Sequence, residues 1–194
     1  MAYTPPLFST DNRLGVDMTT AGYDQPYVLS TSTPEYPAIP FAVGTEATIS
    51  QGGAAIYAQA TAAAVAQGDV CIILTSPATA TATGISPTFY AVGLTSTNAA
   101  TNAAYSPLGV SLSALATGNY GWFQTQGNCP AVSLVNGLAA GALLYTTATA
   151  GRLGAIATGA NYRVAGIFPL TTSAGTAGVY PGVILPTFAL ATAQ

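Results

Sequence analysis

Glycine and proline interrupt almost every stretch of this sequence, and this punctuation restricts what the chain can fold into. The 194 residues include 21 glycines and 13 prolines, and both residue types disfavour the interior of a helix. From Glu46 onward, short apolar runs alternate with such turn signals, which is typical of β-strands. The candidate strands are 54–60, 69–74, 89–94, 109–112, 121–126, 131–134, 143–146, 162–169 and 178–185. The sequence therefore predicts a mainly β fold.

One segment is ambiguous between two kinds of local structure. Residues 59–67, QATAAAVAQ, are rich in alanine, which favours a helix. The Gly68-Asp69 pair that follows equally suits a strand that leads into a hairpin. Both alternatives are open at the level of sequence.

The first 45 residues differ from the remainder of the chain. They hold nearly half of the prolines and show no period of 2 or 3.6, which predicts an extended segment. A disordered tail is one interpretation. An arm that lies on a neighbouring subunit is the other, and the aromatic content favours it because disordered tails are poor in aromatics. The expected anchors of this arm are Tyr3, Leu7, Phe8, Tyr23, Tyr27, Tyr36 and Phe41.

Charge is scarce in this chain. Charged residues make up 5% of it, against about 25% in an average globular protein. Lysine and histidine are absent, and no charged residue lies between Asp69 and Arg152. A free monomer usually keeps a charged surface for solubility, so a neutral surface predicts a protein that contacts partners.

The composition also argues against two classes of partner. Three scattered arginines and a net charge of −3 do not form the basic patch that nucleic acid requires. The most apolar window, 131–150, is broken by polar residues and glycines, so a membrane-spanning helix is not expected. The N-terminus lacks the pattern of a secretory signal. We therefore expect synthesis in a cytoplasm, with no nucleic-acid and no membrane partner.

The residues that usually perform catalysis are few. Histidine, the commonest general base, is absent, and of the six acids only Glu46 and Asp69 follow the arm. Asp69 in Gln-Gly-Asp is better explained as a turn residue. Cys71 and Cys129 are isolated and are predicted to be free thiols. The sequence thus predicts no enzyme, no metal site and no cofactor.

The β region, 46–194, contains a possible internal repeat. Segment 62–74 resembles segment 135–147, and AVGL at 91–94 matches VAGI at 164–167 in the same register. This register suggests two modules, 46–128 and 129–194.

The single tryptophan, Trp122, lies in a strand-like run, NYGWFQTQG, at 119–127. Alternation places Tyr120, Trp122 and Gln124 on one face and Gly121, Phe123 and Thr125 on the other. Core packing explains such a strand, and a surface for a subunit or carbohydrate is the alternative.

Several of these segments together resemble a known family. They are Gly68-Asp69 after small apolar residues, the Tyr-Gly-Trp strand at 120–127, LAAGALLY at 138–145, TAGRLGA at 149–155, VAGI at 164–167 and a last strand that ends in Pro186. The region 45–188 resembles the head decoration, or capsid cement, proteins of tailed bacteriophages.

This resemblance implies a tulip- or barrel-like β domain that assembles as a homotrimer. It implies binding between major capsid protein subunits on the outer capsid surface of a virion, where the protein stabilises the shell. It carries no catalytic residues. A phage fibre, spike or other adhesin-like module is the alternative function, and another shell protein, such as the major subunit itself, is a third.

Overall fold

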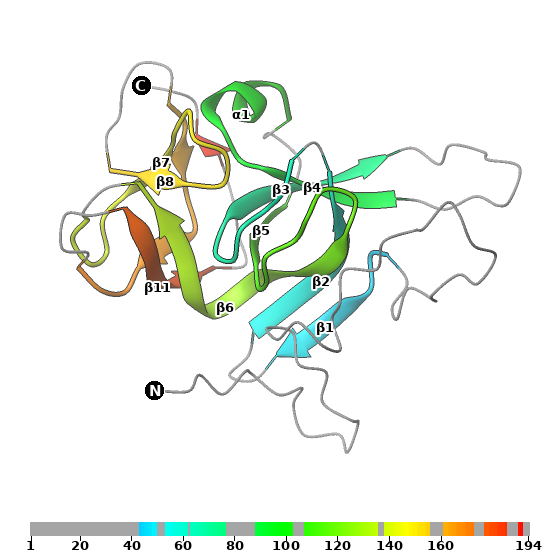
Figure 1. Ribbon diagram of the computed structural model, residues 1–194. Helices are drawn as coiled ribbons and strands as arrows, with labels where there is room; N and C mark the ends of the chain where they lie inside the picture. Colours follow the sequence, from blue (N-terminus) through cyan, green and yellow to red (C-terminus); the bar gives the residue numbers. More distant parts are fainter. Residues whose placement is uncertain are drawn as a thin grey trace, which may run out of the picture.

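The computed structural model describes residues 43–49, 53–61, 63–76, 88–102, 107–135, 138–155, 161–172, 177–185 and 190–191. These residues form two connected β-sheets and one short helix (Figure 1). In chain order the elements are β1 (Glu46–Ile49), β2 (Gly53–Ala60), β3 (Val70–Ser76), β4 (Thr88–Gly93), α1 (Ser96–Asn102), β5 (Leu108–Ser111), β6 (Tyr120–Leu134), β7 (Leu144–Thr146), β8 (Leu153–Gly154), β9 (Arg163–Val164), β10 (Ile167–Pro169), β11 (Gly178–Ile184) and β12 (Leu190–Ala191). The predicted mainly β, barrel-like fold is confirmed.

The first sheet closes into a five-stranded barrel in the order β2-β4-β3-β5-β6, with β6 paired back to β2. The pairing of β2 with β4 is parallel, and the other pairings of the barrel are antiparallel. Strand β1 adds to β2 as an antiparallel hairpin. Apolar residues from β2, β3, β4 and β6 fill the barrel, including Ile56, Ile73 and Phe123.

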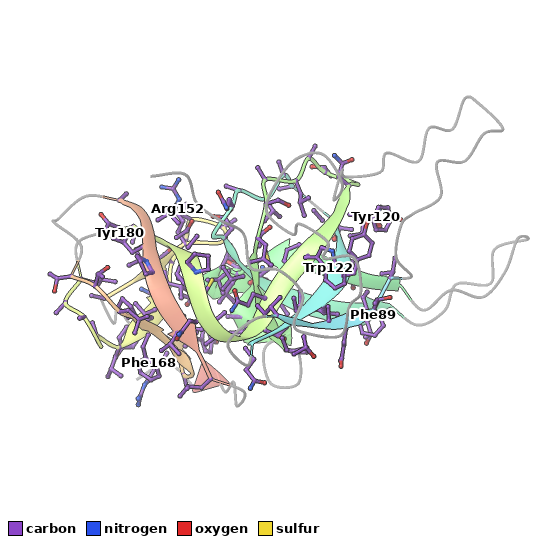
Figure 2. All side chains as sticks on the ribbon, turned by 90° about the horizontal axis from the view of Figure 1, so that it is seen from below. Phe89, Tyr120, Trp122, Arg152, Phe168 and Tyr180 are labelled. Carbon is purple, nitrogen blue, oxygen red and sulfur yellow. The ribbon has the colours of Figure 1, made fainter. Side chains whose placement is uncertain are left out.

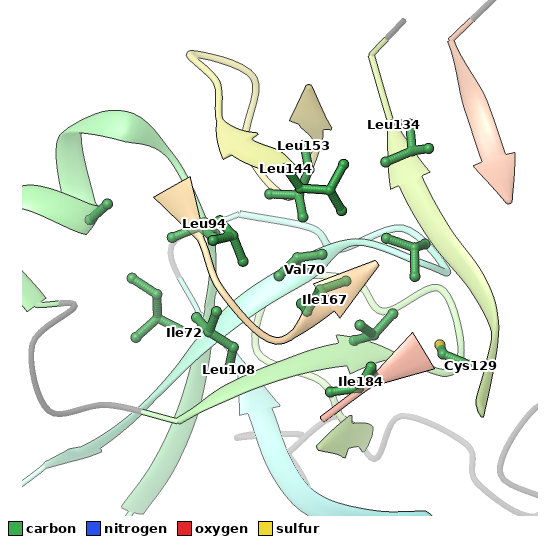
Figure 3. Packing of buried hydrophobic residues seen from close by; sticks show 14 of the residues in the cluster. Val70, Ile72, Leu94, Leu108, Cys129, Leu134, Leu144, Leu153, Ile167 and Ile184 are labelled. Carbon is green, nitrogen blue, oxygen red and sulfur yellow. The ribbon is translucent and has the colours of Figure 1, made fainter. Parts of the chain in front are cut away.

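The second sheet has the order β10-β11-β6-β8-β7-β9-β12. The largest apolar core among the described residues lies between this sheet and the outer side of the barrel (Figure 3). Val70, Ile72 and Leu108 enter this core from barrel strands, and Leu144, Leu153 and Ile184 enter it from the second sheet. Successive side chains of a strand point to opposite faces, so Val70 and Ile72 of β3 enter this core while Cys71 and Ile73 point into the barrel.

Strand β6 belongs to both sheets. Its first half pairs with β2 and its second half pairs with β11. Between the halves, the buried Gln124 amide donates to the carbonyls of Gln126 and Asn128, each at 2.9 Å. Gly127 lies there with a φ of +95°, and a Cβ on it would approach the Gly53 Cα to 2.7 Å. Two strands, 121–126 and 131–134, were predicted here, whereas the structure has one strand, which crosses the predicted module boundary at 128–129.

Four turns of one kind precede strands in both sheets. In each, the third residue is a glycine with a φ between +72° and +87°, and the fourth residue donates its N–H to the first carbonyl at 3.1–3.2 Å. This geometry matches a type II turn, which requires a positive φ at its third residue. The glycine N–H also donates to a carbonyl of a distant segment, at 2.7–3.0 Å. The turns are 66–69, 116–119, 139–142 and 149–152.

The first two of these turns follow two residues that pair with each other. Val65 and Leu115 form an isolated antiparallel bridge, with both N–H···O distances at 2.8 Å. Gly68 then donates to Ser111 and Gly118 donates to Ala60.

For the repeat proposed from sequence, Gly68 and Gly141 do occupy the same kind of turn. Gly93 lies in β4, whereas Gly166 lies in the turn between β9 and β10.

The structure excludes one of the two alternatives that the sequence left open, and it contains a helix that was not predicted. Residues 59 and 60 end β2, and Val65 forms the bridge to Leu115, so the helical alternative for 59–67 is excluded. The helix that does occur, α1, begins at a reciprocal cap. The Asn98 N–H donates to Thr95 Oγ1 at 3.1 Å, and the Thr95 N–H donates to Asn98 Oδ1 at 2.7 Å. This Thr-x-x-Asn spacing resembles a capping box and was the available sequence signal.

Hydrogen bonds between neutral side chains attach α1 to the second sheet. Ser96 Oγ donates to Asn161 Oδ1 at 2.8 Å and lies 3.1 Å from Thr146 Oγ1. Thr146 Oγ1 also accepts the Tyr162 N–H at 2.9 Å. The helix is therefore fixed to the rest of the protein without an ion pair.

Candidate interaction surface

The tryptophan strand contributes to a buried aromatic cluster on the outer side of the barrel wall (Figure 2). The Trp122 and Tyr57 ring centroids are 5.2 Å apart, and the Tyr57 and Tyr120 rings stack at 6.2 Å. Trp122 is 1% exposed. The predicted alternation is confirmed, because Tyr120 and Trp122 lie in this cluster and Phe123 lies in the barrel interior. Within the structure Trp122 is a core residue, and a contact of its indole with a partner stays a prediction.

The other predicted contact residues belong to the N-terminal segment. Tyr3, Leu7, Phe8, Tyr23, Tyr27, Tyr36 and Phe41 all lie outside the described residues. Their proposed role as anchors of an arm is therefore taken up below as a proposal.

The ionisable groups of the described residues are dispersed. Asp69 is buried and its Oδ2 accepts the Ala66 N–H at 2.9 Å, so the predicted turn role of Asp69 is confirmed. Glu46, Arg152 and Arg163 are exposed. Within the described ranges no three Cys, Asp or Glu residues come together as metal ligands.

Both cysteines are free and buried. Burial, together with the nearby Asp69 charge, raises the pKa of the Cys71 thiol well above its usual range. Burial raises the pKa of Cys129 to about 12, although a hydrogen bond with the Ala131 backbone acts in the opposite direction. Neither thiol is therefore an activated nucleophile, because the thiolate is the reactive form.

A prediction about reactivity follows from these buried thiols. In the native protein at pH 8, we expect a thiol-reactive dye to label neither cysteine within minutes, whereas both label at once in denaturant. Because both folded pKa values are raised, the contribution of the thiols to stability is complete below the ordinary thiol pKa of 9.0 and is lost as pH rises toward 12. Rapid stoichiometric labelling of the folded protein, measured by mass spectrometry, would contradict this burial.

An uncharged apolar face is the distinctive surface feature. In β11, the even-numbered residues point inward and are buried or half-buried, and the odd-numbered residues point outward. Val183 pairs with Phe168, and the Leu170 N–H donates to the Pro181 carbonyl at 2.9 Å, which places Phe168 and Leu170 on the same outward side. We define the β10–β11 face as Phe168, Leu170, Val179, Pro181, Val183 and Leu185.

The large side chains of this face are exposed to an unusual degree. Val179 is 51% exposed, Leu170 is 50% exposed and Leu185 is 43% exposed. Leu143, 43% exposed, follows the turn 139–142, whose Gly141 N–H donates to the Pro169 carbonyl at 2.8 Å. Contiguous exposed apolar surface marks interaction sites in folded proteins.

The outer edge of β10 is closed to a further strand at Pro169. This residue has no N–H, and its carbonyl is already taken by Gly141. A partner can therefore pack on the β10–β11 face more readily than it can extend the sheet at that edge. This face was not predicted from the sequence, although the alternation of Val179, Pro181, Val183 and Leu185 was its signal.

Comparison with protein-family models, with curated proteins and with solved structures finds no match to this chain. In the described part of the chain, no helix has the length and apolar character needed to cross a membrane.

Proposed function

We propose that this chain is a structural protein of a phage virion, which decorates and stabilises the capsid shell. The supporting observation is the character of the described surface: three exposed ionised residues, Glu46, Arg152 and Arg163, and an apolar sheet face without charge. The proposed partners are further copies of the chain and the major capsid protein. The proposed location is the outer capsid surface, after synthesis in the host cytoplasm.

The physical case rests on what an interface must bury. Removing an unpaired ionised group from water costs several kcal/mol. An interface made of Ala, Thr, Val and Leu side chains avoids that cost and gains roughly 25 cal/mol for each Å² of apolar area removed from water. A two-sheet scaffold with such a surface suits permanent assembly.

The proposed stoichiometry is a homotrimer. Closed point symmetry is the rule for homo-oligomers, and the resemblance of residues 45–188 to decoration proteins favours three copies over two. Light scattering of the purified full chain tests this directly. A mass of three chains is expected, and a monomer at micromolar concentration would contradict the proposal.

Attachment to particles should depend weakly on salt. Ion pairs on surfaces are screened within about 8–10 Å at physiological ionic strength, whereas apolar and neutral hydrogen-bonded contacts are not. Raising NaCl from about 0.05 to 1 M over purified particles is therefore expected to release little of the protein, as followed by sedimentation and gel analysis. Release of most copies by moderate salt would show that charge, not neutral contact, holds the protein to the shell.

A further inference from the structure

An extended segment suits the β10–β11 face better than a compact partner does. The largest apolar patch of a typical monomer covers about 300–600 Å², whereas each side of a stable interface buries about 800 Å². The face offers six apolar side chains from one hairpin. An extended segment suits such a face, because it can cover the face and then continue over the surface around it.

The chain itself contains a segment of matching chemistry. Residues 1–10 include Tyr3, Leu7 and Phe8 and carry no charged side chain. Pro5 and Pro6 favour an extended backbone that needs no strand partner. This agrees with the blocked outer edge of β10 at Pro169. Residues 1–10 and the β10–β11 face are therefore both apolar and uncharged.

Geometry favours the face of another copy. The segment joins the described structure at Val43, beside β1, and Gly44 there lies against the Phe89 ring. Figure 2 shows Phe89 at the end of the molecule opposite to Phe168 and Tyr180. The 42 residues before Val43 span up to roughly 140 Å when extended. They can therefore leave the barrel end and reach a neighbouring molecule without crossing their own.

We propose that residues 1–10 of one copy bind the β10–β11 face of a neighbouring copy, so that the arms link the subunits of the oligomer. This inference rests on the proposed oligomeric function and identifies one of its contacts. Leu7 and Phe8 supply the apolar anchors, and Leu170, Val183 and Leu185 supply the surface that they cover.

The scarcity of basic residues makes this contact easy to map. Trypsin can cut only after Arg13, Arg152 and Arg163, which gives the peptides 1–13, 14–152, 153–163 and 164–194. Residues 1–10 lie in the first peptide, and the whole β10–β11 face lies in the last. A covalent link between these two peptides therefore reports the contact directly.

The experiment places the photo-crosslinking amino acid p-benzoylphenylalanine at Leu170 of the full chain. After irradiation, the expected product is a covalent dimer on a denaturing gel, from which trypsin releases peptide 1–13 joined to peptide 164–194. The matched control carries the same probe at Thr117, an exposed residue of the barrel turn 116–119, and should not capture peptide 1–13. Leu185 serves as a second probe position if the Leu170 variant does not fold.

A second variant tests the anchors. Changing Leu7 and Phe8 together to serine in the probe-bearing chain should reduce the yield of this product about tenfold, since one buried apolar anchor often contributes a factor of ten in affinity. An unchanged yield would overturn the assignment of the anchors. A joined peptide that is recovered only from the monomer band would overturn the proposed contact between copies. A dimer in which the β10–β11 face is joined only to residues after Val43 would overturn the role of residues 1–10. A trimer in light scattering without the joined peptide overturns this inference alone, whereas a monomer overturns the proposed function as well.

Discussion

Changing Gly151 to alanine is expected to lower the free energy of unfolding by about 2–5 kcal/mol, from backbone strain and overpacking together. Gly151 has a φ of +75°, and a Cβ on it would lie 2.5 Å from both Cβ and Cγ of the buried Asp69. Its main chain also joins the two sheets, since it donates to Leu94 at 3.0 Å and accepts from Val70 at 2.8 Å. The Asp69 side chain cannot move away without losing its hydrogen bond to the Ala66 N–H.

Gly118 provides the matched control for this substitution. It occupies the same position of the same kind of turn with a φ of +86°, and a Cβ on it would meet nothing within 4 Å. Gly118→Ala should therefore cost only the backbone term, about 1–2 kcal/mol. Urea unfolding measures the free energy of unfolding of both variants. Equal losses for Gly151→Ala and Gly118→Ala would show that contact between the turn 149–152 and Asp69 does not contribute to stability.

The second large effect is expected at the aromatic cluster. Trp122→Ala should destabilise the fold by about 3–5 kcal/mol, the usual range for removing a large buried aromatic side chain. The indole is 1% exposed and packs against Tyr57, which is fully buried. Truncation leaves a cavity on the outer wall of the barrel, where β2 and β6 are paired.

Thr117→Ala is the control, because Thr117 is exposed at a barrel turn and surface substitutions usually change stability by less than about 0.5 kcal/mol. The measurement is the midpoint of urea unfolding for the unchanged protein, Trp122→Ala and Thr117→Ala. The three midpoints are compared at an equal dependence of the free energy of unfolding on urea. A loss below about 1 kcal/mol for Trp122→Ala would mean that the tryptophan is not part of the core.

Most strands could be predicted because their signals are local. The apolar runs at 54–60, 69–74 and 89–94 agree with β2, β3 and β4 within one or two residues. The alternation around Trp122 correctly assigned Phe123 to the face opposite the tryptophan. Both patterns depend only on neighbours in sequence.

Features that depend on distant segments could not be predicted in the same way. The alanine-rich run at 59–67 favours a helix by propensity, yet the bridge between Val65 and Leu115, fifty residues apart, determines its conformation. The continuity of β6 through Gly127 depends on the close approach of Gly53 and on the Gln124 side chain. The β10–β11 face becomes visible only when the register of the two strands is known.

Heating of particles assembled with and without this chain tests the proposed function most directly. Particles lacking the protein are expected to release their DNA at a lower temperature, measured by the fluorescence of a DNA-binding dye. Purified full-length protein, added back, is expected to bind to the shells and to restore the higher temperature. Identical release temperatures, together with no binding of the added protein to expanded shells, would contradict a role in capsid stabilisation.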